Sequence, residues 1–449
     1  MRKELYHSVF FIGIGGSGMS SLAHILLDKN IRVAGYDKND SASVRDLVNR
    51  GVAIYKSIDE VDTKDYAAAV YSSAIGKNHP VYDLFFKQGT KLLHRSQLLH
   101  EIFAIGRSIS VAGSHGKTTT TTMLAQIFTE SAIDPTVMVG AGVSFFSGRG
   151  GRAGKGEWGI YESDESDGTF LNHSADIKIV TNIDSDHLDY YKNTHTLYQA
   201  FLQHLTTGSG RAIVYSADEG IRNMLQMGYN NQEITGYTDT ESQPDNYRFQ
   251  IQNDTLQFYL HNKQYSLQLP LPGDHYLRNA MAAIIAASLS GIAVENSIAI
   301  LKNFKGPSRR MELLGEYHGC KIYDDYGHHP TEIFYVIQTA KKLAGSIDDI
   351  VFIFQPHRYS RTAELYREFA EVFSSVPFLF LLPVYSAGEE AIEGIDSGLI
   401  AAQLDSVSLL SGNRQQDTQQ VQKAIQDKKL LVCIGAGDVR KWGEEIINL

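Results

Sequence analysis

The stretch SISVAGSHGKTTTTTMLAQIFTE, residues 108 to 130, restricts the fold more than any other part of the chain. An apolar run, a glycine-rich turn and a helix-like run follow one another, which is the order of a strand, a loop and a helix in a parallel α/β unit. The turn from Gly113 to Thr119 predicts a nucleotide phosphate loop, in which Lys117 reaches the phosphates and Thr118 binds Mg²⁺. A strict phosphate-loop motif would have its first glycine at position 111, where this chain has Val111. A purely structural glycine turn is therefore the alternative.

A second strand, turn and helix begin near residue 7. Gly13, Gly15 and Gly18 have G-x-G-x-x-G spacing, and Asp37 follows the next strand-like run, IRVAGYD. Glycines here let a phosphate approach the helix N-terminus, where backbone N–H groups favour anions. The pattern alone predicts either a dinucleotide-binding turn or a close-packed turn without a ligand.

The length of 449 residues predicts several cores, and the strand series divide the chain into three parts. We expect domains at residues 1–105, 106–307 and 308–449, with hinges near 105 and 307. Residues 246–269 alternate polar and apolar side chains and predict antiparallel strands added to the second part. The third part contains four apolar strand-like runs, from KIYDDYG to LLVCIGAGDV. The fold class is therefore α/β with mostly parallel sheets.

The net charge of −10 argues against a basic surface for nucleic acid or anionic membrane. No stretch reaches the ~18 to 20 apolar residues of a membrane span, so no membrane insertion is expected. Cys320 and Cys433 lie in apolar runs, which favours buried thiols in a reducing compartment over a disulfide. The first residues, with Arg2 and Lys3, lack the features of a cleaved leader, and we expect a cytoplasmic protein.

Two acidic clusters follow apolar runs in the second part: ESDESD from Glu162 and NIDSDHLD up to Asp189. Carboxylates at the carboxyl ends of strands lie where an α/β sheet binds ligands, and Mg²⁺ prefers oxygen ligands. Glu162 and His187 are the predicted metal ligands together with Thr118. Solvated acidic loops are the alternative reading.

Polar residues gather after two runs of the third part, in DDYGHHPTE and FQPHRYSRT. Arginines there could pair with a substrate carboxylate in a bidentate way. These runs place six candidates at one sheet edge: Tyr326, His328, His329, His357, Arg358 and Arg361. Elsewhere, His275 and Asn279 could hold an adenine edge or cap a helix, and Arg309 and Arg310 could reach phosphates or be solvated.

Together these motifs resemble the Mur ligase family along essentially the whole chain, in the order GIGGSGMS, GSHGKTTTT, ESDESD, NIDSDHLD, GDHYLRNA, YDDYGHHPTEI and FQPHRYSRT. Ser114 and Ser163 depart from the family's usual Thr and Ala. The resemblance implies an N-terminal Rossmann-like domain for a UDP-sugar, a central P-loop ATPase-like domain with an added antiparallel sheet, and a C-terminal Rossmann-like domain for an amino acid.

Within the family, HHPTE and QPHRYSRT resemble the member that joins L-alanine to UDP-N-acetylmuramate through an acyl phosphate. The implied cofactor is Mg²⁺ or Mn²⁺ with ATP as co-substrate. We expect no NAD, and no carbamylated lysine because the helix THTLYQAFLQHL lacks Lys. A monomer or weak homodimer that closes during turnover is expected.

The resemblance also implies residue roles. The ATP site would comprise Gly113, Ser114, His115, Gly116, Lys117, Thr118, Thr119, His275, Asn279 and Arg309. The UDP-sugar site would comprise Gly15, Gly16, Ser17, Gly18, Met19, Asp37, Ser72, Ser73, Arg95, Asp164, Glu165, Ser166 and Asp167. The amino acid would meet Tyr326, His328, His357, Arg358 and Arg361. Catalysis would use Lys117, Glu162 and His187, with either His328 or His329 assisting the amine.

Three other readings remain open from the sequence. A recycling ligase would attach a preformed peptide to the same UDP-sugar. A nicotinamide-dependent dehydrogenase would explain Gly13 to Asp37 but leaves the phosphate loop without a role. A catalytically silent nucleotide sensor would not need the histidines and arginines of the third part.

Overall fold

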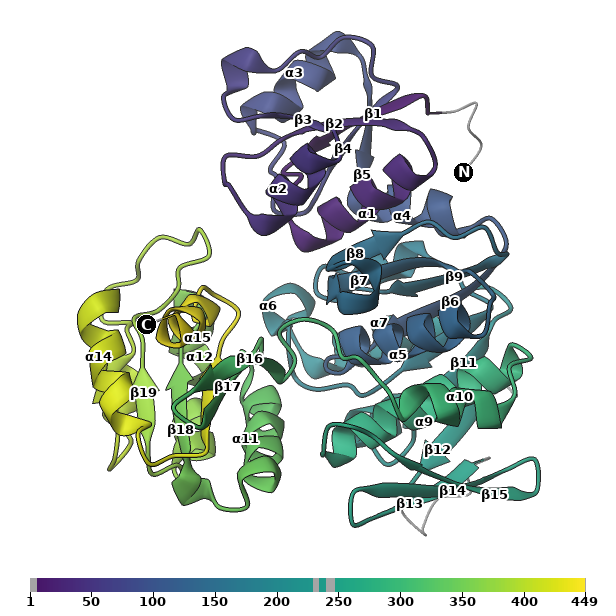
Figure 1. Ribbon diagram of the computed structural model, residues 1–449. Coiled ribbons are helices and arrows are strands. Elements are labelled where there is room, and N and C mark those ends of the chain that lie inside the picture. The colour runs from purple at the N-terminus through teal and green to yellow at the C-terminus, as the bar shows by residue number, and fades with distance from the viewer. Residues whose placement is uncertain (1–5, 229–233, 240–246, 449) are drawn as a thin grey trace. The chain divides into compact units, whose positions relative to one another are not determined.

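The computed structural model describes residues 6–228, 234–239 and 247–448. Arg2 and Lys3 of the predicted non-leader N-terminus, and Asn246 at the start of the predicted antiparallel segment, lie outside these residues. The chain divides into two compact units: the first comprises Met1–Pro270 and Tyr276–Pro307, and the second comprises Leu271–His275 and Ser308–Leu449. Three sheets build these units (Figure 1). The predicted domain limits at 105 and 307 stay a prediction.

The first sheet has five parallel strands in the order β3-β2-β1-β4-β5. Its strands are β1 (Ser8–Ile12), β2 (Arg32–Tyr36), β3 (Ala53–Tyr55), β4 (Ala68–Tyr71) and β5 (Lys91–His94). Its helices are α1 (Ser17–Asp28), α2 (Ala42–Asn49), α3 (Pro80–Gln88) and α4 (Arg95–Phe103), with a 3-10 turn at Ile58–Glu60. Separate hydrophobic clusters cover its two faces, which explains the nearly continuous apolar strands. The predicted parallel α/β unit is confirmed.

The second sheet has ten strands in the order β15-β14-β13-β12-β11-β10-β6-β9-β7-β8. They are β6 (Arg107–Ala112), β7 (Thr136–Val143), β8 (Arg149–Arg152), β9 (Trp158–Glu162), β10 (Ile177–Val180), β11 (Arg211–Tyr215), β12 (Ile234–Thr238), β13 (Tyr247–Gln252), β14 (Thr255–Leu260) and β15 (Lys263–Gln268). The predicted antiparallel pairing holds for β13–β14 and β14–β15. However, β13 pairs in parallel with β12, so these strands extend the large sheet. The antiparallel pair β7–β8 was not predicted.

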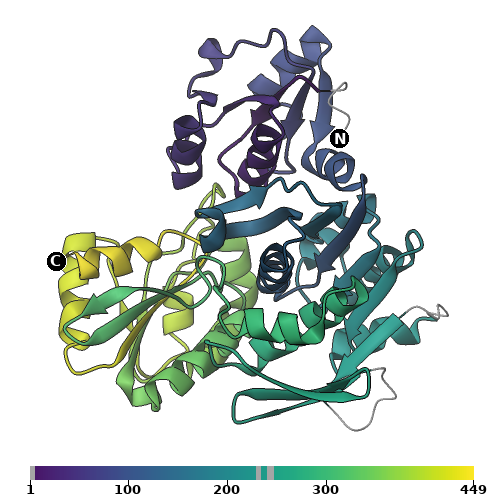
Figure 2. The same ribbon diagram turned by 45° about the vertical axis from the view of Figure 1, so that its right-hand side comes forward.

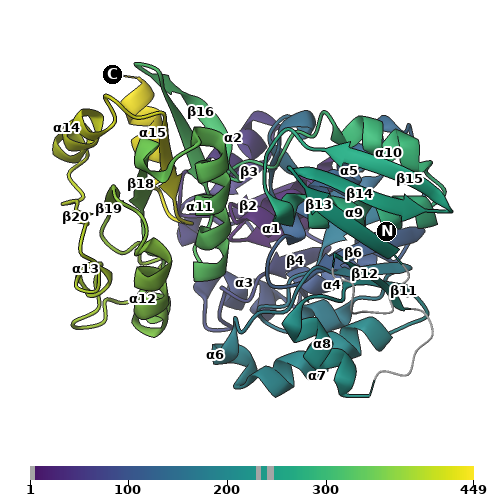
Figure 3. The ribbon, with the colours of Figure 1, turned by 90° about the horizontal axis from the view of Figure 1, so that it is seen from below.

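The helices of this part are α5 (Lys117–Glu130), α6 (Leu188–Tyr191), α7 (Thr194–Thr206), α8 (Glu219–Gln226), α9 (Asp274–Leu289) and α10 (Val294–Leu301), with 3-10 turns at Ser144–Phe146 and Thr169–Asn172. In two views α9 and α10 lie beside the strands β13 to β15 (Figures 1 and 3). The five consecutive threonines of α5, residues 118–122, are buried although they are polar. Thr121 and Thr122 satisfy their hydroxyls on the carbonyls of Lys117 and Thr118, at 2.8 and 2.7 Å, which lets this polar run enter the core.

The second unit is built on a six-stranded sheet in the order β16-β17-β21-β18-β19-β20. Its strands are β16 (Glu312–Tyr317), β17 (Cys320–Asp325), β18 (Ile350–Phe354), β19 (Leu379–Leu381), β20 (Ser408–Leu409) and β21 (Leu430–Ile434). Its helices are α11 (Pro330–Ala344), α12 (Tyr359–Phe373), α13 (Gly398–Ala401), α14 (Arg414–Ala424) and α15 (Arg440–Ile447), with a 3-10 turn at Ile347–Asp349. Helices cover both faces of this sheet, drawn green to yellow in Figure 2, and each face has its own apolar cluster.

Three findings in this unit bear on the sequence predictions. The first edge strand, β16, is antiparallel to β17 and was not predicted. The strands before the two polar motifs, β17 and β18, are not neighbours, because β21 pairs with both and lies between them. Cys320 and Cys433 are buried free thiols, as predicted.

Among the described residues no helix is long and apolar enough to cross a membrane.

Candidate active site

The predicted phosphate loop connects β6 to α5. Gly113 and Gly116 have φ of 126° and 84°, a region that side chains other than glycine rarely adopt. A Cβ at Gly113 would also lie 2.3 Å from Oγ1 of Thr181. The loop is braced by the segment after β10, since the His115 backbone N–H donates to Asn182 Oδ1 at 2.9 Å and the His115 ring lies 3.0 Å from Asp184. These two positions therefore require glycine, and the second acidic cluster supports the loop.

Lys117, the first residue of α5, curls its ammonium group back into this loop. Its Nζ donates to the carbonyl of Gly113 at 2.6 Å and to Oε1 of Glu165 at 2.5 Å. Burial lowers the pKa of Lys117, but the charges of Glu165, Asp164 and Glu162 outweigh burial and hold that pKa above its ordinary value. The lysine is therefore a fixed positive charge in the centre of the loop.

Glu162 ends β9 beside the second residue of α5. The Thr118 hydroxyl lies 3.1 and 3.2 Å from the two carboxylate oxygens of Glu162, and the Gly140 backbone N–H donates to one of them at 2.8 Å. A Cβ on Gly140 would lie 2.8 Å from that carboxylate. Gly140 was missed by the sequence reasoning, and its only sign was a glycine inside a strand, which often marks a close approach of another group.

Glu165 lies with the phosphate loop, although it was predicted among the UDP-sugar residues. Its side chain is 1% exposed, and its Oε2 has no hydrogen-bond partner among the described residues. Burial raises the pKa of Glu165 to about 7 even though Lys117 pulls it down. The ring of His187 lies 3.9 Å from the other oxygen of Glu165 and 3.5 Å from Asp186. Lys117, Glu165 and His187 thus form one cluster from three distant parts of the chain.

The glycine turn after β1 adjoins the start of α1. The Gly15 N–H donates to Asp37 at 2.8 Å, and Gly16 is the N-cap of α1. A Cβ on Gly18 would lie 2.6 Å from Nη1 of Arg95, so this glycine leaves room for the guanidinium group. In this sheet order β1 and β4 are the strands at which the connections reverse direction, which is where open α/β sheets bind ligands.

Arg95 connects this turn to the first acidic cluster. Its guanidinium donates to Asp164 at 3.0 Å. Burial alone would raise the pKa of Asp164, but Arg95 and Lys117 hold it well below its usual range. The Ser73 hydroxyl donates to Asp167 and also lies 3.0 Å from His94, a residue the sequence reasoning missed.

Four further predicted UDP-sugar residues have structural contacts. The side chain of Met19 is buried in the core. The Ser17 carbonyl accepts from the Ser21 hydroxyl at 2.8 Å, the Ser72 carbonyl closes a turn with Ile75, and the Ser166 N–H donates to Asp164. Met19 therefore cannot contribute its side chain without repacking, while its backbone stays at the start of α1.

The second unit brings together the rings of its predicted residues. The ring centroid of His328 lies 5.4 Å from that of Tyr326 and 5.9 Å from that of His357. The His357 ring stacks on Tyr385 at 5.7 Å, and its Nδ1 lies 3.3 Å from Arg361. Burial lowers the pKa of His328 to about 4 and that of His357 to about 3, so both rings are neutral at pH 7.

Arg358 is the N-cap of α12 and is less tightly held than the rings. Its φ is 72°, its N–H donates to the Tyr385 carbonyl at 2.8 Å, and its Nε lies 3.9 Å from Glu389. Its side chain is 49% exposed, which leaves the guanidinium available for a ligand. Tyr385, which contacts both His357 and Arg358, was not predicted.

The remaining predicted ATP-site residues have contacts in different parts of the chain. Asn279 adjoins the phosphate loop, since a Cβ on Gly116 would lie 2.8 Å from its Oδ1. The His275 ring lies 4.8 Å from that of Tyr335 within the second unit. Arg309 donates to Asp324 at 3.1 Å and to the carbonyl of Gly435, after β21, at 2.6 Å.

Family models cover most of the chain. Residues 8–107 match "Mur ligase family, catalytic domain", residues 111–287 match "Mur ligase middle domain", and residues 309–438 match "Mur ligase, glutamate ligase domain". The chain is 34% identical to the UDP-N-acetylmuramate--L-alanine ligase of Rhizobium etli, over 97% of this chain and 95% of that protein. The chain belongs to the Mur ligase family. The enzyme of the same name from Pelotomaculum thermopropionicum is 35% identical to this Mur ligase, over 98% of this chain and 97% of the relative.

Solved structures share the fold of this Mur ligase. A UDP-N-acetylmuramate-alanine ligase from Thermotoga maritima has a TM-score of 0.82 at 22% identity, over 98% of each chain. A murein peptide ligase from Psychrobacter arcticus has a TM-score of 0.75 at 21% identity, also over 98% of each chain. At these identities the two structures support the three-domain α/β fold alone.

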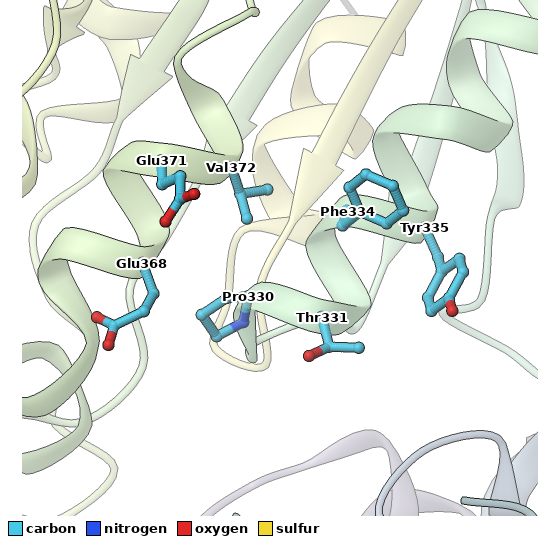
Figure 4. Close-up of a pocket in the computed structure, with 7 residues that line it drawn as sticks. All are labelled: Pro330, Thr331, Phe334, Tyr335, Glu368, Glu371 and Val372. Atoms are coloured by element: carbon cyan, nitrogen blue, oxygen red, sulfur yellow. The ribbon is translucent and has the colours of Figure 1, made fainter. Parts of the chain in front are cut away.

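A cavity of about 330 Å³ in the second unit of this Mur ligase lies between α11 and α12 (Figure 4). It contains none of the predicted site residues and is lined by Pro330, Thr331, Phe334, Tyr335, Glu368, Glu371 and Val372. The cavity is therefore distinct from the ring cluster around His328, and we assign it no role.

Proposed function

We propose that this Mur ligase joins L-alanine to UDP-N-acetylmuramate at the expense of ATP, giving UDP-N-acetylmuramoyl-L-alanine, ADP and phosphate. The observation that carries the proposal is the 34 to 35% identity, over nearly the whole chain, to relatives named for this reaction. The buried free thiols favour a reducing compartment, and we propose the cytoplasm as its location. We keep the expectation of a monomer or weak homodimer.

We propose that ATP binds at the phosphate loop, with Gly113 to Thr119 around the phosphates and Asn279 near the base. Lys117 is the supporting feature, because its buried ammonium group is held among the loop carbonyls. On binding, the phosphates would replace these carbonyls and Glu165 as partners of the lysine. His275 and Arg309 remain proposed ATP-binding residues, although Tyr335 and Asp324, which they contact, belong to the second unit.

The residues beside the loop fit a divalent cation. The Thr118 hydroxyl and the Glu162 carboxylate are hard oxygen ligands of the kind that Mg²⁺ and Mn²⁺ prefer. The orphaned Oε2 of Glu165 and the ring of His187 lie in the adjoining cluster. When bound, the metal would neutralise phosphate charge during transfer.

The chemistry requires activation, because a carboxylate does not condense with an amine at neutral pH. Phosphoryl transfer to the muramate carboxylate gives an acyl phosphate, which the neutral amine then attacks. Two anions must meet in the first step, and Lys117, whose side chain is only 14% exposed, offsets their repulsion. Removing one such preorganised charge typically costs ~10² to 10³ in rate.

We propose that the UDP-sugar binds at the turn after β1 and along the start of α1, from Gly15 to Met19. The N-terminus of a helix of 12 residues favours the diphosphate, and Arg95 lies against the Gly18 turn. Asp37, already bound to Gly15, would contact the nucleoside. Asp164, which Arg95 contacts, completes the proposed site together with Ser72, Ser73, Ser166 and Asp167.

We propose that the amino acid binds in the ring cluster of the second unit. Arg358 and Arg361 would hold its carboxylate, while Tyr326, His328 and His357 surround its ammonium group and methyl group. One methyl is worth roughly 1 to 3 kcal/mol of discrimination, so some use of glycine is expected. The relatives at 34 to 35% identity are named for the alanine reaction, so the recycling ligase is not favoured.

The test is phosphate release by the purified protein with Mg-ATP and UDP-N-acetylmuramate. We expect release that requires L-alanine, and loss of at least about a hundredfold in Lys117→Ala. Lys155→Ala, which removes an exposed lysine of the same unit, serves as the matched control. Release only with L-Ala-γ-D-Glu-meso-diaminopimelate would indicate the recycling ligase, and no release with any amine would refute the ligase proposal.

A further inference from the structure

Two adjacent histidines, His328 and His329, lie between β17 and α11, and the sequence offers no means of ranking them as the base. A neutral imidazole carries one proton, on either Nδ1 or Nε2, and only the other nitrogen can accept a proton. The hydrogen-bond partners of Nδ1 therefore determine which ring can act as a base.

His328 has two acceptors next to Nδ1. The carbonyl oxygen of Tyr326 lies 3.1 Å from this nitrogen, and Oε2 of Glu332 lies 3.4 Å from it. Neither a carbonyl nor a carboxylate can donate, so the proton of the neutral ring lies on Nδ1. Nε2 of His328 is then the nitrogen with the free electron pair.

His329 has the opposite arrangement. It is the N-cap of α11, and its Nδ1 accepts from the Thr331 backbone N–H at 3.4 Å. An Nδ1 that accepts cannot carry the proton, so the proton lies on Nε2. In this state His329 can donate through Nε2 but offers no free nitrogen to a substrate.

Glu332 holds His328 through more than its ring. The backbone N–H of His328 donates to Oε2 of Glu332 at 3.0 Å, and Arg310 donates to Oε1 at 3.1 Å. Only 11% of the Glu332 side chain is exposed. Its place in the first turn of α11 also suits a negative charge, because the helix dipole is positive there.

We infer that Glu332 is a positioning residue that fixes His328 as the Nδ1–H tautomer, so that Nε2 of His328, and not His329, takes the proton from the amine of the incoming amino acid. This inference rests on the proposed function for its substrate. In this role Glu332 contacts none of the substrates and acts only through His328.

The proton balance is as follows. An N–H bond of the ammonium breaks and its proton moves to Nε2 of His328, which leaves an electron pair on nitrogen. That pair forms the C–N bond to the acyl phosphate, and the C–O bond to phosphate breaks. The nitrogen loses a second proton to the leaving phosphate, and the imidazolium returns its proton to solvent.

The first test needs no substrate. In the full chain labelled with ¹⁵N-histidine, long-range ¹H–¹⁵N NMR spectra distinguish the two tautomers, and His328→Gln and His329→Asn assign the two rings. We expect Nδ1–H for His328, Nε2–H for His329, and a partial shift of His328 to Nε2–H in Glu332→Gln. A wild-type His328 found as Nε2–H would overturn the inference whatever the enzyme ligates.

The second test is kinetic. The charged and titratable groups that face His328 are Glu332, Arg310, Arg361, His357 and Tyr326. Glu332 is the negative charge among these groups and favours protonation of His328, so Glu332→Gln moves the acid limb of the rate to lower pH. It also lowers kcat about tenfold or more while the KM values for ATP and the UDP-sugar stay within about twofold.

Two comparisons separate positioning from a structural effect. Glu368→Gln removes an exposed carboxylate from α12 of the same unit and should leave both kcat and the acid limb unchanged. His329→Asn keeps the helix cap and should leave the acid limb where it is in the wild type. An acid limb that moves in His329→Asn but not in Glu332→Gln would overturn the inference, while absence of turnover in the wild type would instead reject the proposed function.

Discussion

At the scale of single residues, buried carboxylates determine how the protein responds to pH. Asp325 ends β17 at 2% exposure and accepts the backbone N–H groups of Met311 and Gly327, both at 2.8 Å. Burial nevertheless raises the pKa of Asp325 to about 6, since removal from water disfavours the charge more than Arg310 favours it. The two hydrogen bonds thus hold the Asp325 side chain in its buried position, but they do not offset the cost of ionising it there.

The shift predicts a loss of stability as Asp325 ionises. A carboxyl group with a raised folded pKa contributes stability that is complete below the unfolded pKa and is lost as pH rises through about 6. Asp325→Asn cannot ionise, so its free energy of unfolding should fall less between pH 4.5 and 6.5 than that of the wild type. The difference has an upper limit of about 3 kcal/mol. Urea unfolding at both pH values measures it, and parallel changes in the two proteins would contradict the prediction.

At the scale of elements, the connection from β6 to α5 depends on backbone shape. Gly113 has a positive φ and almost no space for a side chain. Gly148 also has a positive φ, of 79°, but a Cβ there would meet nothing within 4 Å. The two glycines therefore separate the cost of backbone conformation from the cost of a steric clash.

Gly113→Ala should be destabilised more than Gly148→Ala and should lose ATP binding. A residue in a disfavoured backbone region costs roughly 1 to 3 kcal/mol, and the clash with Thr181 adds to this only at Gly113. Thermal unfolding and titration with a non-hydrolysable ATP analogue measure the two effects. Equal stability and unchanged ATP affinity in the two variants would show that the loop tolerates a Cβ.

At the scale of the whole molecule, the chain has two compact units with separate cores. Each unit contains one of the two tryptophans, Trp158 in β9 and Trp442 in α15, and both are nearly buried. Chains with several cores commonly depart from two-state unfolding. Fluorescence can therefore follow each unit by itself.

In Trp442→Phe the remaining Trp158 should report unfolding of the first unit. In Trp158→Phe the remaining Trp442 should report unfolding of the second unit, at a different denaturant concentration. A non-hydrolysable ATP analogue with Mg²⁺ should shift the midpoint seen by Trp158 more than that seen by Trp442, because the phosphate loop belongs to the first unit. Coincident midpoints that shift together would show that the units unfold as one.

The sequence by itself determined the parallel α/β class, the phosphate loop, the glycine turn after β1 and the buried thiols. Each of these follows from the local sequence, because an apolar run, a glycine at a tight turn and a helix-like run lie within about 25 residues of one another. The acidic clusters were also found locally, because they follow the strands β9 and β10 directly.

Only the tertiary structure decided which of these groups meet. The contact of Lys117 with Glu165 spans 48 residues, and the contact of Arg95 with Asp164 spans 69. The place of β21 between β17 and β18 left no local sign, and the N–H of Gly140 on Glu162 left only a glycine inside a strand. The tautomers of His328 and His329 depend on neighbours such as Glu332 whose side chains fold back on them. Such contacts are set by strand order and side-chain direction, which are properties of the packed chain and not of any one segment.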